Sequence, residues 1–170
     1  LTHVHIAVDA PVQFYALLYV PEKAPFDLFH KERRGVKLYA KRVLIVEDAE
    51  KLTPSYLRFL RGVVDSEDLS LNVSREMLQE DRTLMQIEQQ ITKQVLKTLK
   101  ELADEKPEAY ATFWREFGRV FKEGLTSDWK NKDAIAELCR FESMRTEAGK
   151  WLSLADYVAA MPESQKEIYY

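Results

Sequence analysis

One stretch of the sequence, residues 65–79, combines residue types that could bind a phosphate group; it reads DSEDLSLNVSREMLQ. Ser74 is well suited to cap a helix, because its hydroxyl can accept a free backbone N–H of the first helical turn. Arg75 follows, and a guanidinium beside open N–H groups at a helix N-terminus forms a ready anion site. Gln79 lies one turn later on the same side. Arg75 and Gln79 are therefore predicted to supply half of a phosphate site.

A simpler role for Arg75 stays open, in which it is a surface side chain paired with Glu67 or Asp68. Together with Asp65, these two acids form an acidic group at the start of the stretch. Such a group could hold a metal ion, but a solvated loop explains it equally simply. We therefore predict no metal here.

Other kinds of active site are not indicated. Five glycines form neither G-x-x-x-x-G-K-[ST] nor G-x-G-x-x-G, so no phosphate cradle is present. His3 and His5 alternate with apolar residues as on an exposed strand, and no third metal ligand stands out beside them. No histidine lies near a plausible nucleophile elbow. Cys139 lies on an apolar helix face, which favours a core position. No complete active site and no cofactor are expected within this chain.

Length and composition limit the possible functions. The 170 residues suffice for one domain or a pair of small subdomains, and 46% of them are apolar, enough for a real core. The net charge of −3 gives no electrostatic case for binding nucleic acid or a membrane surface. No apolar run approaches the roughly 20 residues of a spanning helix. A single cysteine and no visible signal peptide fit a cytoplasmic protein. The chain opens without Met, as expected for a piece of a longer protein.

Two strong strands are predicted in the first part of the chain, after a weaker alternation over residues 1–10. Residues 12–20 are apolar on both faces, which is typical of an interior strand. Residues 36–46 predict a second strand, whose last part, 43–46, is a solid apolar run expected to be buried. Thr53 and Pro54 then signal a helix that continues through residues 56–64.

The second part of the chain predicts helices. Apolar residues recur every three or four positions from Arg75 to about Glu105, a rod of roughly 45 Å. Pro107 opens a second helix with an aromatic face, which is expected in the core, although a client-binding patch stays open. A short helix over 133–141, a last helix capped by Ser153, and a final strand over 165–170 complete an α+β chain.

In this order the motifs resemble the middle domain of the ninety-kilodalton heat-shock chaperone (Hsp90) family, in particular its bacterial HtpG type. The resemblance covers nearly the whole chain. It is carried by residues 24–29 (APFDLF), 61–69 (RGVVDSEDL), 71–79 (LNVSREMLQ), 140–141, 153–157 and 165–170.

The fold that this resemblance implies is layered αβα. Residues 1–105 would form a partial large αβα subdomain, with a catalytic loop over 65–79 and the long helix. Residues 106–145 would form a connecting helical coil. Residues 146–170 would begin a smaller αβα subdomain.

The resemblance also implies a role in ATP hydrolysis. In the family an N-terminal domain binds ATP with Mg²⁺, and the middle domain reaches an arginine to the γ-phosphate. By position that residue is Arg75, with Gln79 and Asn72 as neighbours in the same loop. The middle domain also contacts unfolded client proteins, and a C-terminal domain forms the homodimer. The chain alone would have no turnover. An alternative of another class is a passive protein–protein interaction module with no role in hydrolysis.

Two positions depart from the family pattern. Ser70 stands where many members have proline, which loosens the loop slightly. Leu44 stands where an aromatic residue is common, at a position thought to contact the ATP domain.

Overall fold

The structure is a computed structural model that describes residues 1–29, 35–71, 82–144, 146–147 and 149–168. The three predicted site residues, Asn72, Arg75 and Gln79, lie outside the described residues. Within the described residues, no helix is long and apolar enough to cross a membrane.

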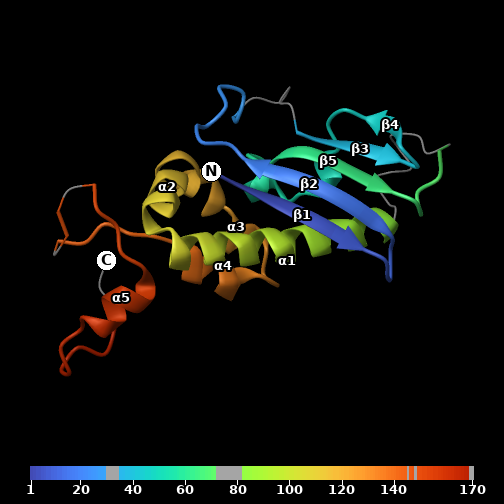
Figure 1. Cartoon of the computed structure of the whole chain (residues 1–170). Coiled ribbons are helices and arrows are strands. Elements are labelled where there is room, and N and C mark those ends of the chain that lie inside the picture. Colours follow the sequence, from blue (N-terminus) through green and yellow to red (C-terminus); the bar gives the residue numbers. More distant parts are fainter. Residues whose placement is uncertain (30–34, 72–81, 145, 148, 169–170) are drawn as a thin grey trace.

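A five-stranded mixed sheet forms one layer of the fold (Figure 1). Its spatial order is β1-β2-β5-β3-β4, and every neighbouring pair is antiparallel except β3 and β5, which are parallel. The α+β class predicted from the sequence is confirmed. The strands are β1 (Thr2–Val8), β2 (Phe14–Val20), β3 (Val36–Ala40), β4 (Val43–Val46) and β5 (Arg61–Ser66).

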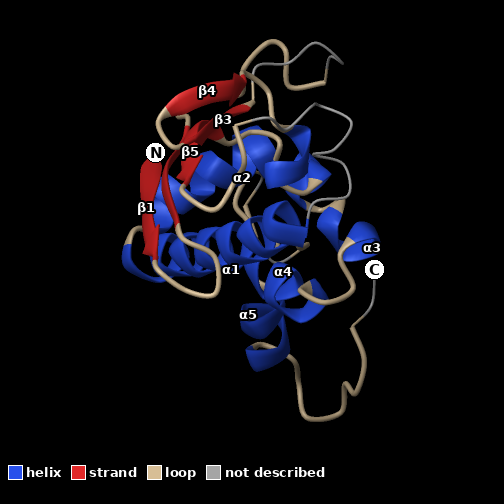
Figure 2. Ribbon diagram, turned by 90° about the vertical axis from the view of Figure 1, so that its right-hand side faces the viewer, coloured by secondary structure: helices blue, strands red, loops and turns tan. Residues whose placement is uncertain are grey.

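Helices cover one face of this sheet (Figure 2). Strand alternation turns Val4, Phe14 and Leu38 to the covered side, where each is buried. Helix α1 (Arg82–Glu105) contacts β1, and α2 (Pro107–Phe121) packs beside α1. The predicted end of the long helix at Glu105 and the start of the next at Pro107 are both confirmed.

The aromatic face of α2 lies in the core, as predicted. Phe113 and Phe117 are fully buried, and both rings pack on Phe59, with centroids 5.4 and 4.8 Å away. Tyr110 and Phe121 extend the same cluster toward either end of the helix. Burial removes these side chains from any exposed client-binding patch.

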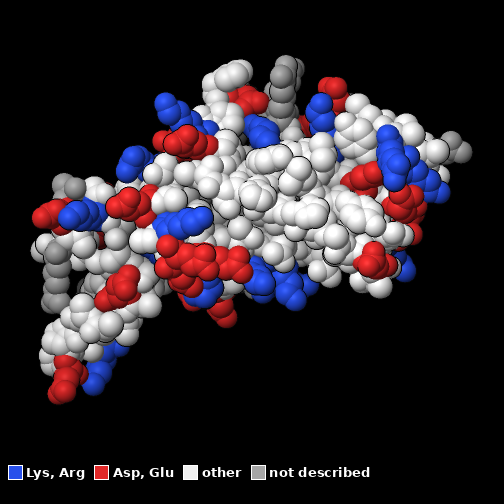
Figure 3. Space-filling model, in the orientation of Figure 1, with Lys and Arg blue, Asp and Glu red and all other residues white. Residues whose placement is uncertain are grey.

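The opposite face of the sheet is exposed. Tyr15 and Tyr19 of β2 are 44% and 47% exposed, and Val63 of β5 lies on the same side. Figure 3 views this face, and few charged side chains lie over β1 and β2. The prediction that β2 is interior is confirmed by its place between β1 and β5, but only one of its faces is buried.

The prediction of one strand over residues 36–46 is wrong, because the chain reverses inside that range. Lys41 and Arg42 have φ of 50° and 68°, so they form a tight turn that joins β3 and β4 as a hairpin. The expected burial of the apolar run is also wrong for its first half. Val43 is 52% exposed and Leu44 is 42% exposed on the edge strand β4.

The predicted helix over residues 53–64 is also wrong. Its first half is only the short 3₁₀ turn η2 (Ser55–Leu57), and a similar turn, η1 (Glu50–Leu52), precedes it. The second half is the central strand β5. Gly62 has φ of 142°, and a Cβ there would lie 2.1 Å from the Leu17 carbonyl oxygen, so the close strand contact requires glycine.

The remaining helices are short. They are α3 (Gly124–Ser127), α4 (Lys132–Leu138) and α5 (Leu154–Ala159). Ser153 caps α5 as predicted, in a reciprocal capping box with Asp156. The strand expected over 165–170 does not form in its described part, residues 165–168.

Candidate functional site

The described residues show how the candidate loop is anchored at both of its ends. The loop leaves β5 through residues 67–71 and returns to the fold at α1. At the return end, Leu84, Ile87 and Ile91 are buried in the core. The departure end is held by a set of side-chain hydrogen bonds.

Gln13, in the turn between β1 and β2, is the centre of that set. Its carbonyl oxygen accepts a bond from Ser66 Oγ at 2.9 Å and a second from the Glu67 N–H at 3.3 Å. Its N–H donates to Asp68 Oδ2 at 2.7 Å. Ser66 Oγ also accepts the Asp68 N–H at 3.3 Å. Both backbone polar groups of Gln13 are therefore bound by residues 66–68.

The β3–β4 turn holds the other side of the same segment. Asp65 Oδ1 accepts the Arg42 N–H at 3.1 Å, and the Ser66 carbonyl accepts the Lys41 N–H at 3.2 Å. A left-handed conformation is unfavourable for residues with a side chain, and these two bonds support it at Lys41 and Arg42. The end of β5 is thus fixed between two turns from distant parts of the sequence.

The acidic group of this loop has a structural role that the sequence analysis missed. Asp65 and Asp68 each accept a backbone N–H, so they do not simply face solvent. No group of three or more His, Cys, Asp or Glu that could hold a metal occurs among the residues described. In the sequence, only the residue types indicated this structural role, because Asp and Ser side chains readily form hydrogen bonds with nearby backbone groups.

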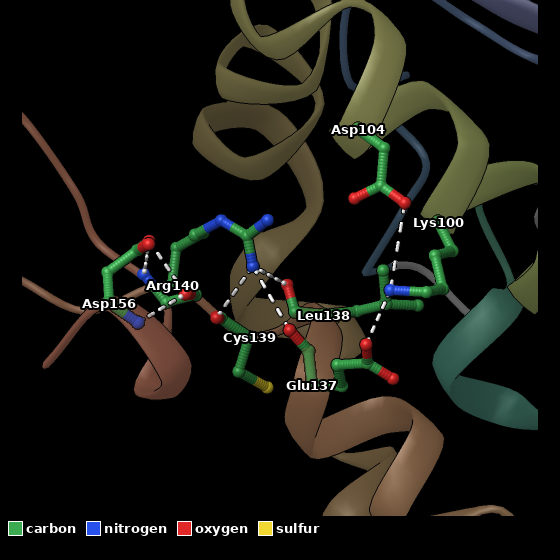
Figure 4. Close-up of polar contacts among 8 residues, drawn as sticks. Lys100, Asp104, Glu137, Leu138, Cys139, Arg140 and Asp156 are labelled. Carbon is green, nitrogen blue, oxygen red and sulfur yellow. Dashed lines mark hydrogen bonds and ion pairs between the residues drawn. The ribbon is translucent and has the colours of Figure 1, made fainter. Parts of the chain in front are cut away.

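A second polar cluster joins α1 to the C-terminal end of α4 (Figure 4). Arg140 Nη1 donates to the carbonyl oxygens of Glu137, Leu138 and Cys139 at 3.0–3.2 Å, which caps the C-terminal end of α4. Lys100 of α1 bonds to Glu137, and this contact raises the lysine's pKa. The cluster is a structural joint between helices.

Cys139, at the end of α4, is fully buried as predicted. Burial raises the pKa of its thiol to about 11, although Lys122 and Arg140 act in the opposite direction. Such a thiol carries almost no thiolate at neutral pH, so it is not a nucleophile.

A cleft of about 640 Å³ lies between α1 and the α3–α4 connection. Asp128 accepts the Tyr56 hydroxyl at 2.8 Å and two bonds from Asn131. Burial opposes the charge of Asp128, but these bonds lower its pKa overall. Across the cleft, burial and the charge of Asp128 raise the pKa of Glu88. Ser127 also lines the cleft, and its hydroxyl donates to the Glu123 carbonyl oxygen at 2.9 Å.

Comparisons with known proteins agree on one family. The Hsp90 protein family profile matches residues 1–170. The chaperone protein HtpG of Chromobacterium violaceum is 52% identical over 98% of this chain, and that of Actinobacillus succinogenes is 50% identical over the same share. The chain spans 27% of the length of each of these relatives.

A solved structure extends the agreement to the fold. The middle domain of a Plasmodium falciparum heat shock protein is 32% identical and superposes with a TM-score of 0.83. It covers 99% of this chain, and the chain covers 64% of it. The chain belongs to the Hsp90 family, and its fold is that of the family's middle domain.

Proposed function

We propose that this chain is the part of an ATP-dependent chaperone of the HtpG type that completes the ATP site of a neighbouring domain. Arg75 contacts the γ-phosphate of ATP held by an N-terminal domain, and Gln79 and Asn72 lie beside it in the loop. The observation that carries the proposal is the anchoring of the loop. Hydrogen bonds from Ser66 and Asp68 to Gln13 fix the chain where it leaves the sheet, and the buried face of α1 fixes it where it returns to the fold.

The arginine's chemical role is electrostatic. In phosphoryl transfer, negative charge is spread over the oxygens of the γ-phosphate, and an arginine placed there stabilises the transition state. The nucleotide and Mg²⁺ would be bound by the N-terminal domain, so this chain alone has no turnover. Anchored loop ends favour this role, because precise placement determines how much stabilisation a single charge gives.

The wider setting follows from the same proposal. The parent protein is a cytoplasmic homodimer that dimerises through a C-terminal domain and acts on unfolded client proteins. Residues 1–105 form part of a large subdomain, residues 106–145 a helical connector and residues 146–170 the start of a small subdomain. Many residues before Phe141 are buried and most described residues after it are not, which supports a boundary near here between the helical connector and the small subdomain.

Nucleotide titration of the isolated chain tests the first part of the proposal. Calorimetric titration with ATP and Mg²⁺ should show no stoichiometric binding, because the chain supplies only one contact to the nucleotide. Tight one-to-one binding would contradict the proposal and point to a self-sufficient nucleotide site.

The passive-module alternative is separated by the substitution Arg75→Ala in the full-length chaperone. If Arg75 only holds its loop together, the variant loses stability but hydrolyses ATP normally. If Arg75 contacts the γ-phosphate, hydrolysis slows steeply while ATP binding and the thermal unfolding temperature are retained.

A further inference from the structure

Strand β1 lies at one edge of the described sheet (Figure 1) and carries two histidines, His3 and His5, on its exposed face. Val4 and Ile6, which alternate with them, are buried on the helix-covered face. Because successive strand residues point to opposite faces, both imidazoles project from the same side of the sheet. The two Cα atoms are separated by two residues of extended strand, a distance of about 6.7 Å.

The surroundings of these imidazoles leave them available to a ligand. Within the described residues, neither imidazole forms a hydrogen bond, an ion pair or a ring contact. Their partners across the β1–β2 ladder are Tyr19 and Leu17, neither of which carries a positive charge that would repel a cation. In the described sheet, no strand pairs with the other side of β1.

We propose that His3 and His5 form a chelating pair for a divalent transition-metal ion that imidazole favours, of the Cu²⁺, Ni²⁺ or Zn²⁺ type. Metal–nitrogen bonds are about 2.0–2.1 Å long, so two nitrogens on one ion lie no more than about 4 Å apart. Two side chains on one strand face can converge to this separation by rotation about χ1 and χ2. Water fills the remaining positions of the ion, because the pair supplies only two donors. The proposal is independent of the role of Arg75.

The regular strand is what makes the two histidines a chelate. All seven residues of β1 pair with β2, and this ladder holds both imidazoles on one face. In the unfolded chain the same side chains sample many separations, so the ion binds the folded sheet more tightly. Saturating metal should therefore raise the thermal unfolding temperature of the chain.

The experiment is a calorimetric titration of the chain with Cu²⁺ and, separately, with Zn²⁺. The amino terminus is acetylated, because the free amine of Leu1 could itself bind Cu²⁺ together with His3. We expect one ion per chain, tighter binding of Cu²⁺ than of Zn²⁺, and an electron paramagnetic resonance spectrum with copper coupled to two nitrogens. His3→Ala and His5→Ala should each weaken binding by at least about tenfold, since even the loss of an outer-shell contact costs about 10–100-fold.

The matched control is the double variant His5→Ala/Ala7→His. Ala7 is exposed on the same face, so this variant keeps the chain's three histidines. It places the two strand histidines about 13 Å apart, too far to share an ion. We expect it to bind Cu²⁺ as weakly as His5→Ala does, and His30→Ala to bind like the wild type.

Three results would overturn the inference. Wild-type affinity in the double variant would show that unpaired exposed histidines suffice. Wild-type affinity in His3→Ala or His5→Ala would remove that residue from the site, and lost binding in His30→Ala would place the ion elsewhere. Each of these results leaves the proposed function of Arg75 intact.

Discussion

The Ser66 hydroxyl donates to the Gln13 carbonyl oxygen at 2.9 Å, which links two residues that lie 53 positions apart in the sequence. Ser66 is completely buried at the end of the central strand β5. The same oxygen accepts the Asp68 N–H, so one buried hydroxyl connects the β1–β2 turn to the start of the candidate loop. The loop is thereby joined to the sheet by side-chain as well as backbone bonds.

Replacing this hydroxyl should destabilise the isolated chain. Ser66→Ala leaves the Asp68 N–H without its partner, whereas the Gln13 oxygen keeps the bond from Glu67. We expect a loss of about 1 kcal/mol in the free energy of unfolding, measured with urea. Glu67→Ala should change it by less than about 0.5 kcal/mol. Equal effects of the two substitutions would show that the Ser66 bonds contribute nothing.

Tyr56→Phe should also be destabilising, in a pH-dependent way. The Tyr56 ring packs edge-on against Phe121, and phenylalanine keeps that contact while losing only the bond to Asp128. A bond to a charged group contributes about 1.5–3 kcal/mol. We expect a loss in this range at pH 7, measured by urea unfolding.

The sign of the pH dependence follows from Asp128. Its pKa is lower in the folded chain than its ordinary value of 3.8. Its ionised form therefore contributes stability above that value, and the contribution is lost as pH falls through the folded pKa. The difference between the wild type and Tyr56→Phe should shrink in strong acid. A difference that stays constant from pH 7 down to strong acid would contradict this account.

Glu88→Gln should stabilise the folded chain at neutral pH, whereas Tyr56→Phe destabilises it. Burial and the neighbouring charge of Asp128 raise the pKa of Glu88, so its ionised form costs stability at neutral pH. The substitution should raise the thermal unfolding temperature at pH 7, and the gain should vanish as pH falls below the ordinary glutamate value of 4.5. Glu22→Gln, in the exposed turn after β2, is the matched control and should change little. A destabilised Glu88→Gln at pH 7 would show that the charge is favourable there.

Cys139 should resist thiol reagents in the folded chain. Its side chain is buried, so a reagent cannot easily reach the sulfur. Its pKa is about 11, so little of the thiol is ionised to the reactive thiolate at pH 7.5. We expect labelling by a disulfide reagent at the rate of unfolding, and immediate labelling in denaturant. Rapid labelling under native conditions would place the thiol at the surface.

The helices were predictable from the sequence, because long apolar periodicity and proline leave few alternatives. The end of α1 at Glu105, the start of α2 at Pro107 and the cap at Ser153 were all correct. The strands were harder to predict. The hairpin turn at Lys41 and Arg42 uses residues that seldom adopt positive φ, and a contact from Asp65 supports it. Local sequence carries no sign of such a distant partner.

The error over residues 53–64 has a related cause. Apolar residues spaced three or four apart fit a helix, but here η2 buries Tyr56 and Leu57, and β5 then buries Val64 as a strand does. Pairing with two neighbouring strands outweighs local preference. In the candidate site, Arg75 could be identified by its position in the family motif. The roles of Ser66 and Gln13 could not be predicted, because they depend on contacts between segments that are distant in the sequence.

The most direct test of the central claim is the ATP turnover of the full-length chaperone with Arg75→Ala, measured at saturating ATP beside ATP affinity. The account predicts that turnover falls by about a thousandfold or more, while the Kd for ATP stays within about threefold of the wild type. Arg75→Lys should also be slow, because an ammonium lacks the forked geometry that fits a phosphate. Wild-type turnover in Arg75→Ala would contradict the claim that this chain completes the ATP site.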